Sequence, residues 1–196
     1  SDLVYYGKAT LLTNPWPRTV GGNTDDLQNR GVYEKGYDLE LAQELADKSG
    51  LTGKTLILAN NGTAEHVTCT EMIQEMLERI GVHTEIRSYD AASFTAVKSD
   101  PTAYDILVSN GVTGNNLMGD NFKSMFMNRI FVIPENWAYG HGQRYYEIFD
   151  DVFQVDDSIR LPVIQELFGY YLETLPNFGM IGFNSFTAVP EDLHTD

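Results

Sequence analysis

Between residues 54 and 110 the chain alternates apolar runs with amphipathic stretches, in an order that predicts strand, helix, strand, short helix and strand. Residues 55–59 are apolar without alternation, which is typical of a strand covered on both faces. Residues 82–87 alternate, which favours an edge strand with one wetter face. Residues 104–108 are again nearly continuous, so we expect a central strand. Parallel strands need helical crossovers, so the pattern predicts an α/β three-layer sandwich, with a mixed, mostly parallel sheet and helices on both faces.

The helices of this unit have recognisable ends. Residues 60–63 supply a turn and a cap for the first helix, and Gly81 closes it. Asp90 caps a shorter helix through Val97, which Pro101 stops. The first helix carries a stripe of apolar residues at helical spacing, which we expect to face the sheet: Val67, Ile73, Met76, Leu77 and Ile80.

Three further helices are predicted outside this unit. The first follows Tyr37-Asp38 and ends at Gly50, with Leu41, Ala42, Leu45 and Ala46 directed inward. The second covers residues 143–153. The third runs over residues 157–174 with Pro162 near its start, and residues 178–183 form a final strand. The third helix should bury a stripe of large apolar residues: Ile164, Leu167, Phe168, Tyr171 and Leu172.

Residues 1–36 show little periodicity and are rich in loop-forming residues, although Val4–Tyr6 could form a short strand. We therefore divide the chain into a leading segment, residues 1–36, and one α/β domain, residues 37–196. Within that domain, residues 110–120 should be irregular, and residues 121–131 are compatible with either helix or extended chain.

Composition limits the possible partners. The 196 residues carry a formal net charge of −15, which argues against nucleic acid and anionic membranes, because both bind clusters of Lys and Arg. The simplest role of that charge is solubility. Cys69, the single cysteine, is expected to be a small buried residue. The sequence contains no apolar run of membrane-spanning length, and no signal peptide precedes Leu3.

Motifs of catalysis are missing from the sequence, which has no nucleophile elbow, phosphate loop or Cys-x-x-Cys pair. The acidic pairs at 150–151 and 156–157 are better explained by capping and surface charge than by acid–base chemistry. We expect no cofactor, no metal and no catalytic residue. The four histidines lack metal-ligand spacing, so we expect them on the solvated surface: His66, His83, His141 and His194. Four aromatic residues could stack on a ligand, but their spacing is more typical of a core: Trp137, Tyr139, Tyr145 and Tyr146.

Polar residues follow two of the predicted strands. Sheets of parallel strands bind ligands at the carboxyl ends of those strands. The loop after Val108 is dense in hydrogen-bonding residues, although a loop that merely turns the chain is the alternative. We expect ligand contact from seven residues: Asn60, Asn61, Asn110, Val112, Thr113, Asn115 and Asn116.

Several stretches occur in the order found in one family. Residues 37–50 are similar to its Tyr-Asp-x-x-x-Ala-x-x-Leu-x-x-x-Gly helix, and residues 71–85 to its Ile-Gln-x-x-Leu-x-x-Ile-Gly-Val-x-Val-Glu helix and strand. Tyr104-Asp105 and residues 120–122 match a Tyr-Asp and an Asp-Pro-Asp-Asn-Phe pattern, and Asp157, Arg160 and Pro176 match a later one. The chain thus resembles the family 5 extracellular solute-binding proteins, the peptide- and nickel-type receptors of bacterial ABC importers.

The resemblance implies one lobe, of the type II periplasmic-binding-protein kind, of a two-lobed receptor that closes on a ligand without turnover. Residues 1–36 would be the hinge-proximal segment, and Phe178 onward the return. The partners implied are a small-molecule or oligopeptide ligand, ABC permease subunits and the missing first lobe of the same chain. The place implied is the periplasm or the outer face of the cell membrane, with a lipid anchor on a segment not present here.

The chain departs from the family at three cleft positions. Gly111-Val112 stands where the family has Gly-Trp, Asn115 where receptors of free short peptides have an acid, and Asn60 where they can have an arginine. Amides give no charge-assisted hydrogen bond to a zwitterion, so we expect a ligand other than a simple free-ended dipeptide.

Two other classes of function stay open from the sequence. One is a free-standing small α/β hydrolase-like enzyme that uses Asp105 or Asp120. The other is an interaction module that works through its acidic face.

Overall fold

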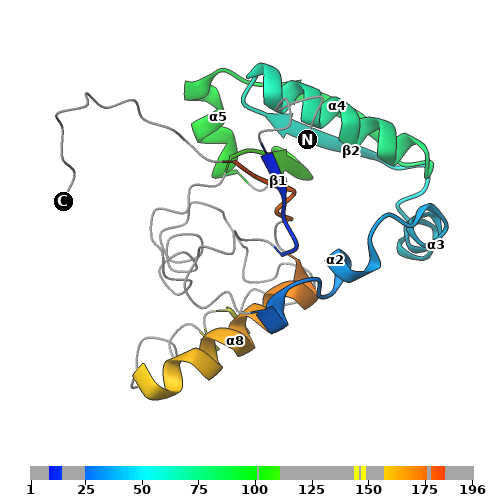
Figure 1. The fold of residues 1–196 in the computed structure, drawn as a ribbon. Coiled ribbons are helices and arrows are strands. Elements are labelled where there is room, and N and C mark those ends of the chain that lie inside the picture. The colour runs from blue at the N-terminus through cyan, green and yellow to red at the C-terminus, as the bar shows by residue number, and fades with distance from the viewer. Residues whose placement is uncertain are drawn as a thin grey trace.

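A three-stranded parallel sheet, in the order β3-β2-β4, organises the fold (Figure 1). The structure is a computed structural model that describes residues 9–14, 25–100, 102–110, 144–145, 147–148, 157–175 and 178–183. Strand β2 is Thr55–Asn60, β3 is His83–Ser88 and β4 is Ile106–Val108. Helix α4 (Ala64–Glu78) connects β2 to β3, and α5 (Ala91–Lys98) connects β3 to β4. Because β3 and β4 flank β2 on opposite sides, right-handed crossovers put α4 and α5 on opposite faces, as the sequence predicts.

The register aligns the carboxyl ends of the strands. Asn60 pairs with Ser88 of β3 and with Val108 of β4, so all three strands end at one edge of the sheet. The prediction that β3 is an edge strand is confirmed. The prediction that residues 104–108 form a central strand is wrong within the described residues, because β4 pairs only with β2, and β2 is central. An apolar run indicates burial but does not specify the order of pairing.

Both ends of α3 and the start of α5 follow the predicted capping residues, whereas α4 ends at Glu78 with Arg79 as its C-cap, before the predicted Gly81. Helix α3 (Leu39–Ser49) begins after Asp38, whose carboxylate accepts a hydrogen bond of 2.9 Å from the backbone N–H of Leu41. Gly50 ends it with a left-handed φ of 74°. Asp90 caps α5 by accepting 3.0 Å hydrogen bonds from the backbone of residues 92 and 93.

Two expected inner positions are exposed instead. Met76 of α4 is 49% exposed and Leu45 of α3 is 52% exposed, so both predictions of burial are wrong. The residues that α4 buries are His66 and Thr70, because its first turns lie over the carboxyl edge of the sheet, where the strand residues are polar. Helix α3 lies beyond the amino end of β2 rather than against a face of the sheet, so its apolar stripe is only partly covered (Figure 1).

A second, antiparallel sheet joins residues near the two ends of the described chain. Strand β1 (Ala9–Leu11) pairs with β5 (Ile181–Phe183), with Ala9 opposite Phe183. The leading segment also contains a 3-10 helix, η1 (Asp25–Leu27), and α2 (Val32–Lys35), so the expectation of little regular structure there is wrong for its described part. The final strand is shorter than the predicted residues 178–183, and Val4–Tyr6 lies outside the described residues.

Helix α8 (Asp157–Thr174) organises a separate hydrophobic core. Pro162 lies inside this helix and Leu175 follows it with a φ of 46°. Residues 144, 145, 147 and 148 are helical, within the predicted helix 143–153. No helix among the described residues is both long and apolar enough to cross a membrane. The predicted inner stripe is confirmed, because all five residues are buried and pack with Leu27, Tyr145 and Ile148: Ile164, Leu167, Phe168, Tyr171 and Leu172.

Candidate functional site

Asn60 closes the turn at the end of β2. Its side chain is fully buried; Oδ1 accepts a 2.8 Å hydrogen bond from the backbone N–H of Gly62, and Nδ2 donates one of 3.2 Å to the hydroxyl of Thr70. Gly62 is needed here, since its φ is 72° and an added Cβ would lie 3.0 Å from the carbonyl oxygen of Tyr89. Both ends of the Asn60 amide therefore bind the protein itself, and its contact with a ligand stays a prediction.

Asn61 begins the connection to α4 and is half-buried. Its Oδ1 accepts hydrogen bonds from the backbone N–H of Thr63 at 3.2 Å and from the Thr63 hydroxyl at 3.0 Å. This local pattern is a turn closed by an asparagine side chain, which suits a residue just before a helix. It fixes the position of the Asn61 oxygen at the carboxyl edge.

His66 links the ends of two neighbouring strands. Its side chain is only 4% exposed. Nδ1 contacts Oδ1 of Asn61 and lies 3.0 Å from the hydroxyl oxygen of Thr63, while Nε2 lies 2.8 Å from Oδ1 of Asn110. The structure thus brings together Asn61 and Asn110, as expected from their places after parallel strands.

The interpretation of His66 as a solvated surface residue is wrong. Its ring contacts Asn110, which follows β4 and lies 44 positions further along the sequence. A sequence signal did exist: His66 lies four residues before Thr70, which puts both on one helix face above the polar end of β2. By contrast, the side chain of His83 is 59% exposed and pairs with Glu78, as a surface histidine would.

The remaining predicted contacts lie outside the described residues: Val112, Thr113, Asn115 and Asn116. The same holds for Asp120, His141 and His194, and for residues 121–131. The described candidate site is therefore the carboxyl-edge cluster, which we define as Asn61, Thr63, His66 and Asn110.

Asp105 has a structural role. One carboxylate oxygen accepts a 2.7 Å hydrogen bond from the backbone N–H of Ile57, and the backbone N–H of Asp105 donates to the carbonyl of Ile57 at 3.0 Å. Asp105 precedes β4, at the amino edge of the sheet, opposite the carboxyl-edge cluster. These positions give no support to a hydrolase-like site built on Asp105.

Neither Cys69 nor a group of metal ligands offers a reactive centre within the described residues. The Cys69 thiol is partly buried, and burial raises its pKa, which keeps it in the unreactive thiol form. Within the described ranges, no three His, Cys, Asp or Glu side chains are grouped as metal ligands. The carboxyl-edge cluster instead offers amide, hydroxyl and imidazole groups, which are suited to hydrogen bonding with a polar solute.

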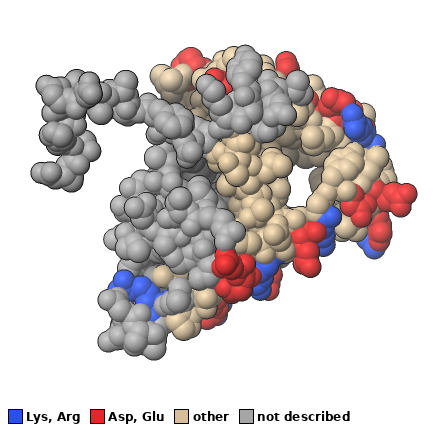
Figure 2. Space-filling model, in the orientation of Figure 1, with Lys and Arg blue, Asp and Glu red and all other residues tan. Residues whose placement is uncertain are grey.

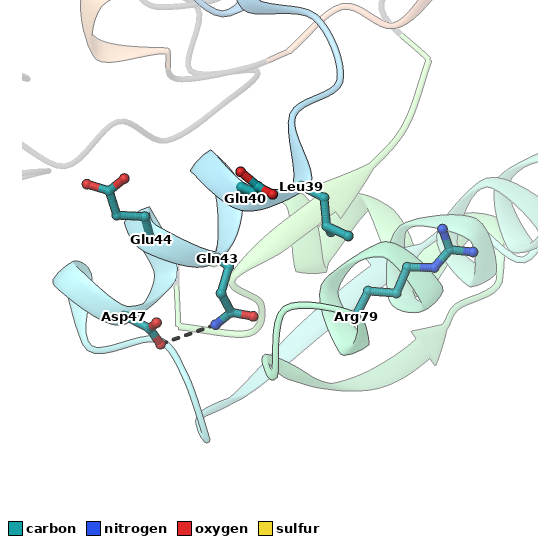
Figure 3. Close-up of a pocket in the computed structure, with 6 residues that line it drawn as sticks. All are labelled: Leu39, Glu40, Gln43, Glu44, Asp47 and Arg79. Carbon is teal, nitrogen blue, oxygen red and sulfur yellow. Dashed lines mark hydrogen bonds between the residues drawn. The ribbon is translucent and has the colours of Figure 1, made fainter.

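A groove of about 510 Å³ lies at the other end of α4, between α3 and the C-cap residue Arg79 (Figure 3). Gln43, one of its lining residues, donates a 3.2 Å hydrogen bond to Asp47. Acidic side chains are prominent over α3 in the space-filling view (Figure 2). This groove is distinct from the carboxyl-edge cluster, and its lining comes mainly from α3: Leu39, Glu40, Gln43, Glu44, Asp47 and Arg79.

A family assignment follows from the sequence profile of the "Bacterial extracellular solute-binding proteins, family 5 Middle", which matches residues 1–129. The chain belongs to this family. Family 5 is one of extracellular solute-binding proteins, not of enzymes. No curated protein sequence matches the chain significantly.

Solved structures share the fold of this family 5 chain. The putative peptide-binding protein AppA from Clostridium difficile is 19% identical and superposes with a TM-score of 0.70 over 89% of this chain and 36% of its own. NikA from Staphylococcus aureus, in complex with Ni(L-His)2, is 16% identical with a TM-score of 0.69 over 92% and 38%. DppA from Helicobacter pylori, in complex with the peptide STSA, is 19% identical with a TM-score of 0.68 over 89% and 34%. The chain thus spans little more than a third of the length of each.

Proposed function

We propose that this chain is the ligand-binding lobe of a two-lobed receptor that captures a small polar solute, such as an oligopeptide, for an ABC importer. The lobe would close on the solute together with a first lobe and present it to permease subunits. Membership of family 5 supports the binding role. The observation that carries the proposal is the carboxyl-edge cluster, where side chains from the ends of β2 and β4 converge on the expected edge of the sheet.

The pairing of β1 with β5 supports the two-lobed arrangement. Ala9 and Phe183 lie opposite each other, so β1, within residues 1–36, and β5, within the segment from Phe178 onward, run side by side. Two adjacent strands of opposite direction are what a lobe needs in order to be connected to a second lobe through a hinge. The division into a hinge-proximal segment, residues 1–36, and a lobe, residues 37–196, is part of this proposal.

The chemistry of the cluster favours an uncharged part of the ligand. Asn61 and Asn110 offer amides and Thr63 a hydroxyl, while the imidazole of His66 is buried. The exposed part of the cluster therefore supplies neither a carboxylate for an amino group nor a Lys or Arg for a carboxylate. We therefore propose that the peptide backbone or a neutral polar group, rather than a free terminus, lies against this edge. A simple free-ended dipeptide would gain no charge-assisted hydrogen bond there.

A thermal-shift assay on the intact receptor tests the proposal. We would compare the tetrapeptide Ser-Thr-Ser-Ala with its N-acetylated, C-amidated form, and extend both to panels of other sequences. A ligand at 100 times its Kd should stabilise the receptor by about 2.7 kcal/mol. The expected result is stabilisation by at least one peptide of the panels, with blocked forms binding as well as free ones.

Matched variants locate the site. Asn110→Ala should weaken binding of the best peptide about tenfold, the effect of losing one hydrogen bond in a buried contact. Gln43→Ala removes an amide from the α3 groove at the far end of α4 and should leave the affinity unchanged. A tenfold preference for free amines would contradict the ligand chemistry, and a loss of binding in Gln43→Ala alone would place the site in the groove instead.

An outer-face location, with the receptor held by a lipid, is the remaining part of the proposal. The outer-face location is supported by membership of family 5, whose members are extracellular. Fractionation of cells that express the natural gene tests the lipid. Detergent-phase partitioning of the product is the expected result, and an aqueous, freely released product would argue against the anchor.

A further inference from the structure

His66 contacts amide side chains through both of its ring nitrogens. It lies in the first turn of α4, and its two amide partners follow β2 and β4. Asn110 is exposed, whereas the ring that holds it is buried. Among the described residues, the Asn110 side chain has no other hydrogen-bond partner. One end of this amide is thus held by the ring; the other end, which has no hydrogen-bond partner among the described residues, we call the outward end.

The proton positions on the ring follow from the partners of Asn61. Oδ1 of Asn61 accepts from both the backbone N–H and the hydroxyl of Thr63, so the group that faces Nδ1 is an oxygen and the hydroxyl donates to that oxygen instead of to the ring. We therefore assign a proton to Nδ1. A neutral imidazole then has only a lone pair at Nε2. That lone pair accepts from an NH2 group but cannot donate to an oxygen.

The orientation of the Asn110 amide depends on whether Nε2 of His66 carries a proton. If Oδ1 of Asn110 faces Nε2, at 2.8 Å, Nε2 has to donate to it, and the ring then needs a proton on both nitrogens. A neutral ring requires the amide to turn by 180°, with its NH2 towards Nε2. In the first arrangement the outward end of Asn110 is a donor, and in the second it is an acceptor.

We propose that His66 is a positioning residue of the ligand site: it holds Asn110 at the carboxyl edge and selects which end of its amide faces the ligand. This inference rests on the proposed function, because the outward end of the amide matters only if a ligand meets it. His66 itself is buried behind Asn61 and Asn110 and acts through them. A purely structural histidine would stabilise the fold without deciding the hydrogen-bonding character of the site.

The first experiment needs no ligand. The full chain, labelled with ¹⁵N in its histidines, reports the protonation of each ring nitrogen through its NMR chemical shift. We expect the Nδ1 resonance of His66 to be that of a protonated nitrogen, and the Nε2 resonance to shift in Asn110→Ala. His83 is the internal control, since it is exposed and should not respond to Asn110→Ala. An unprotonated Nδ1, or an Nε2 resonance that does not respond, would overturn the proposal.

The second experiment measures coupling on the intact receptor, with the best-binding peptide of the blocked Ser-Thr-Ser-Ala panel as the probe. His66→Ala and Asn110→Ala should each weaken binding about tenfold, and the double variant should lose no more than either single one. His83→Ala should bind as the wild type does. Additive losses in the double variant would overturn the proposal.

The two experiments distinguish failure of the proposed function from failure of the role proposed for His66. If no peptide of any panel binds the wild-type receptor, the proposed function fails in its peptide form, while the NMR result still decides whether His66 orients Asn110. If peptides bind and the NMR response is absent, the proposed function stands and the role of His66 fails. His66→Asn, whose amide can still reach one partner, should recover part of the affinity lost in His66→Ala if positioning is its role.

Discussion

The hydroxyl of Tyr33 donates a 2.8 Å hydrogen bond to the backbone carbonyl of Gly179, although 146 residues separate them. The ring of Tyr33 also stacks on that of Phe178, with centroids 4.7 Å apart and planes inclined by 16°. Helix α2 is thereby attached to the segment that leads into β5. Together with the β1–β5 pairing, this contact joins the beginning and the end of the described chain.

Removing the hydroxyl should weaken that attachment. We expect Tyr33→Phe to lower the free energy of unfolding by about 1 kcal/mol, the usual net value of one hydrogen bond. Tyr33→Ala should cost about 0.5–1.5 kcal/mol more, because the aromatic stacking is also lost. Urea denaturation measures both. Tyr37→Phe, at a position 72% exposed, is the control and should change stability by less than about 0.5 kcal/mol.

Buried tyrosines should make the fold sensitive to alkali. Burial raises the pKa of Tyr33, Tyr145 and Tyr171 above the ordinary tyrosine value. Above about pH 10 the unfolded chain releases these protons while the folded chain retains them, so stability should fall as the pH rises further. Below that pH these groups should cause no change. Unfolding curves from pH 8 to pH 12 measure the slope.

One substitution measures how much a single buried tyrosine contributes to the fall of stability at alkaline pH. Tyr145→Phe removes one buried phenol from the α8 core and should flatten the alkaline decline of stability. The matched change Tyr37→Phe removes an exposed phenol and should leave the decline as it is. An equal effect of both variants would show that burial is not the cause.

The cap of α5 should be sensitive to acid. Hydrogen bonds from the backbone and hydroxyl of Ser93, and from the backbone of Ala92, lower the pKa of Asp90. A lowered pKa means that the carboxylate stabilises the fold above the pKa of the unfolded aspartate, about 3.9, and that this contribution is lost as the pH falls further. At pH 7, Asp90→Ala should lower the Tm. Asp90→Asn, whose side-chain oxygen still accepts hydrogen bonds from the backbone, should retain most of the stabilisation by the cap. A Tm unchanged in Asp90→Ala would contradict the capping role.

Two leucines test the difference between predicted and actual burial. Leu167 in α8 is fully buried, and Leu45 in α3 is 52% exposed, although both belong to predicted inner stripes. Leu167→Ala should destabilise the protein by about 2–5 kcal/mol, because it leaves a cavity in the core. Leu45→Ala should cost less than about 0.5 kcal/mol in the described structure. Chemical denaturation of both variants under the same conditions makes the comparison.

Local signals predicted the parts of the fold that local chemistry decides. Asp38 and Asp90 precede their helices because a short carboxylate satisfies free backbone N–H groups, and Gly50 follows α3 because a left-handed φ is easiest for glycine. The inner stripe of α8 could also be predicted, since the apolar face is buried from Ile164 to Leu172. These features depend on residues a few positions apart.

Features that depend on distant segments could not be predicted from the sequence. Helical spacing shows which face of α3 or α4 is apolar, but not how far the neighbouring sheet extends beneath it, so Leu45 and Met76 were misplaced. For His66 the helical spacing to Thr70 was a signal of burial, but its contact with Asn110, 44 positions along the chain, could not be predicted from local spacing. The meeting of Asn61 and Asn110 could be predicted because parallel strands end at a common edge; that His66 bridges their side chains could not.

The pairing of β1 with β5 has a consequence for synthesis on the ribosome. Among the described residues, β1 has no strand partner except β5, which lies close to the end of the described chain. While the protein is being made, the parallel sheet can assemble as soon as β4 has left the exit tunnel, but β1 must wait until the much later strand β5 (Ile181–Phe183) has been made. The waiting strand presents unpaired backbone groups throughout that interval, and it is there that a chaperone would have the longest opportunity to bind.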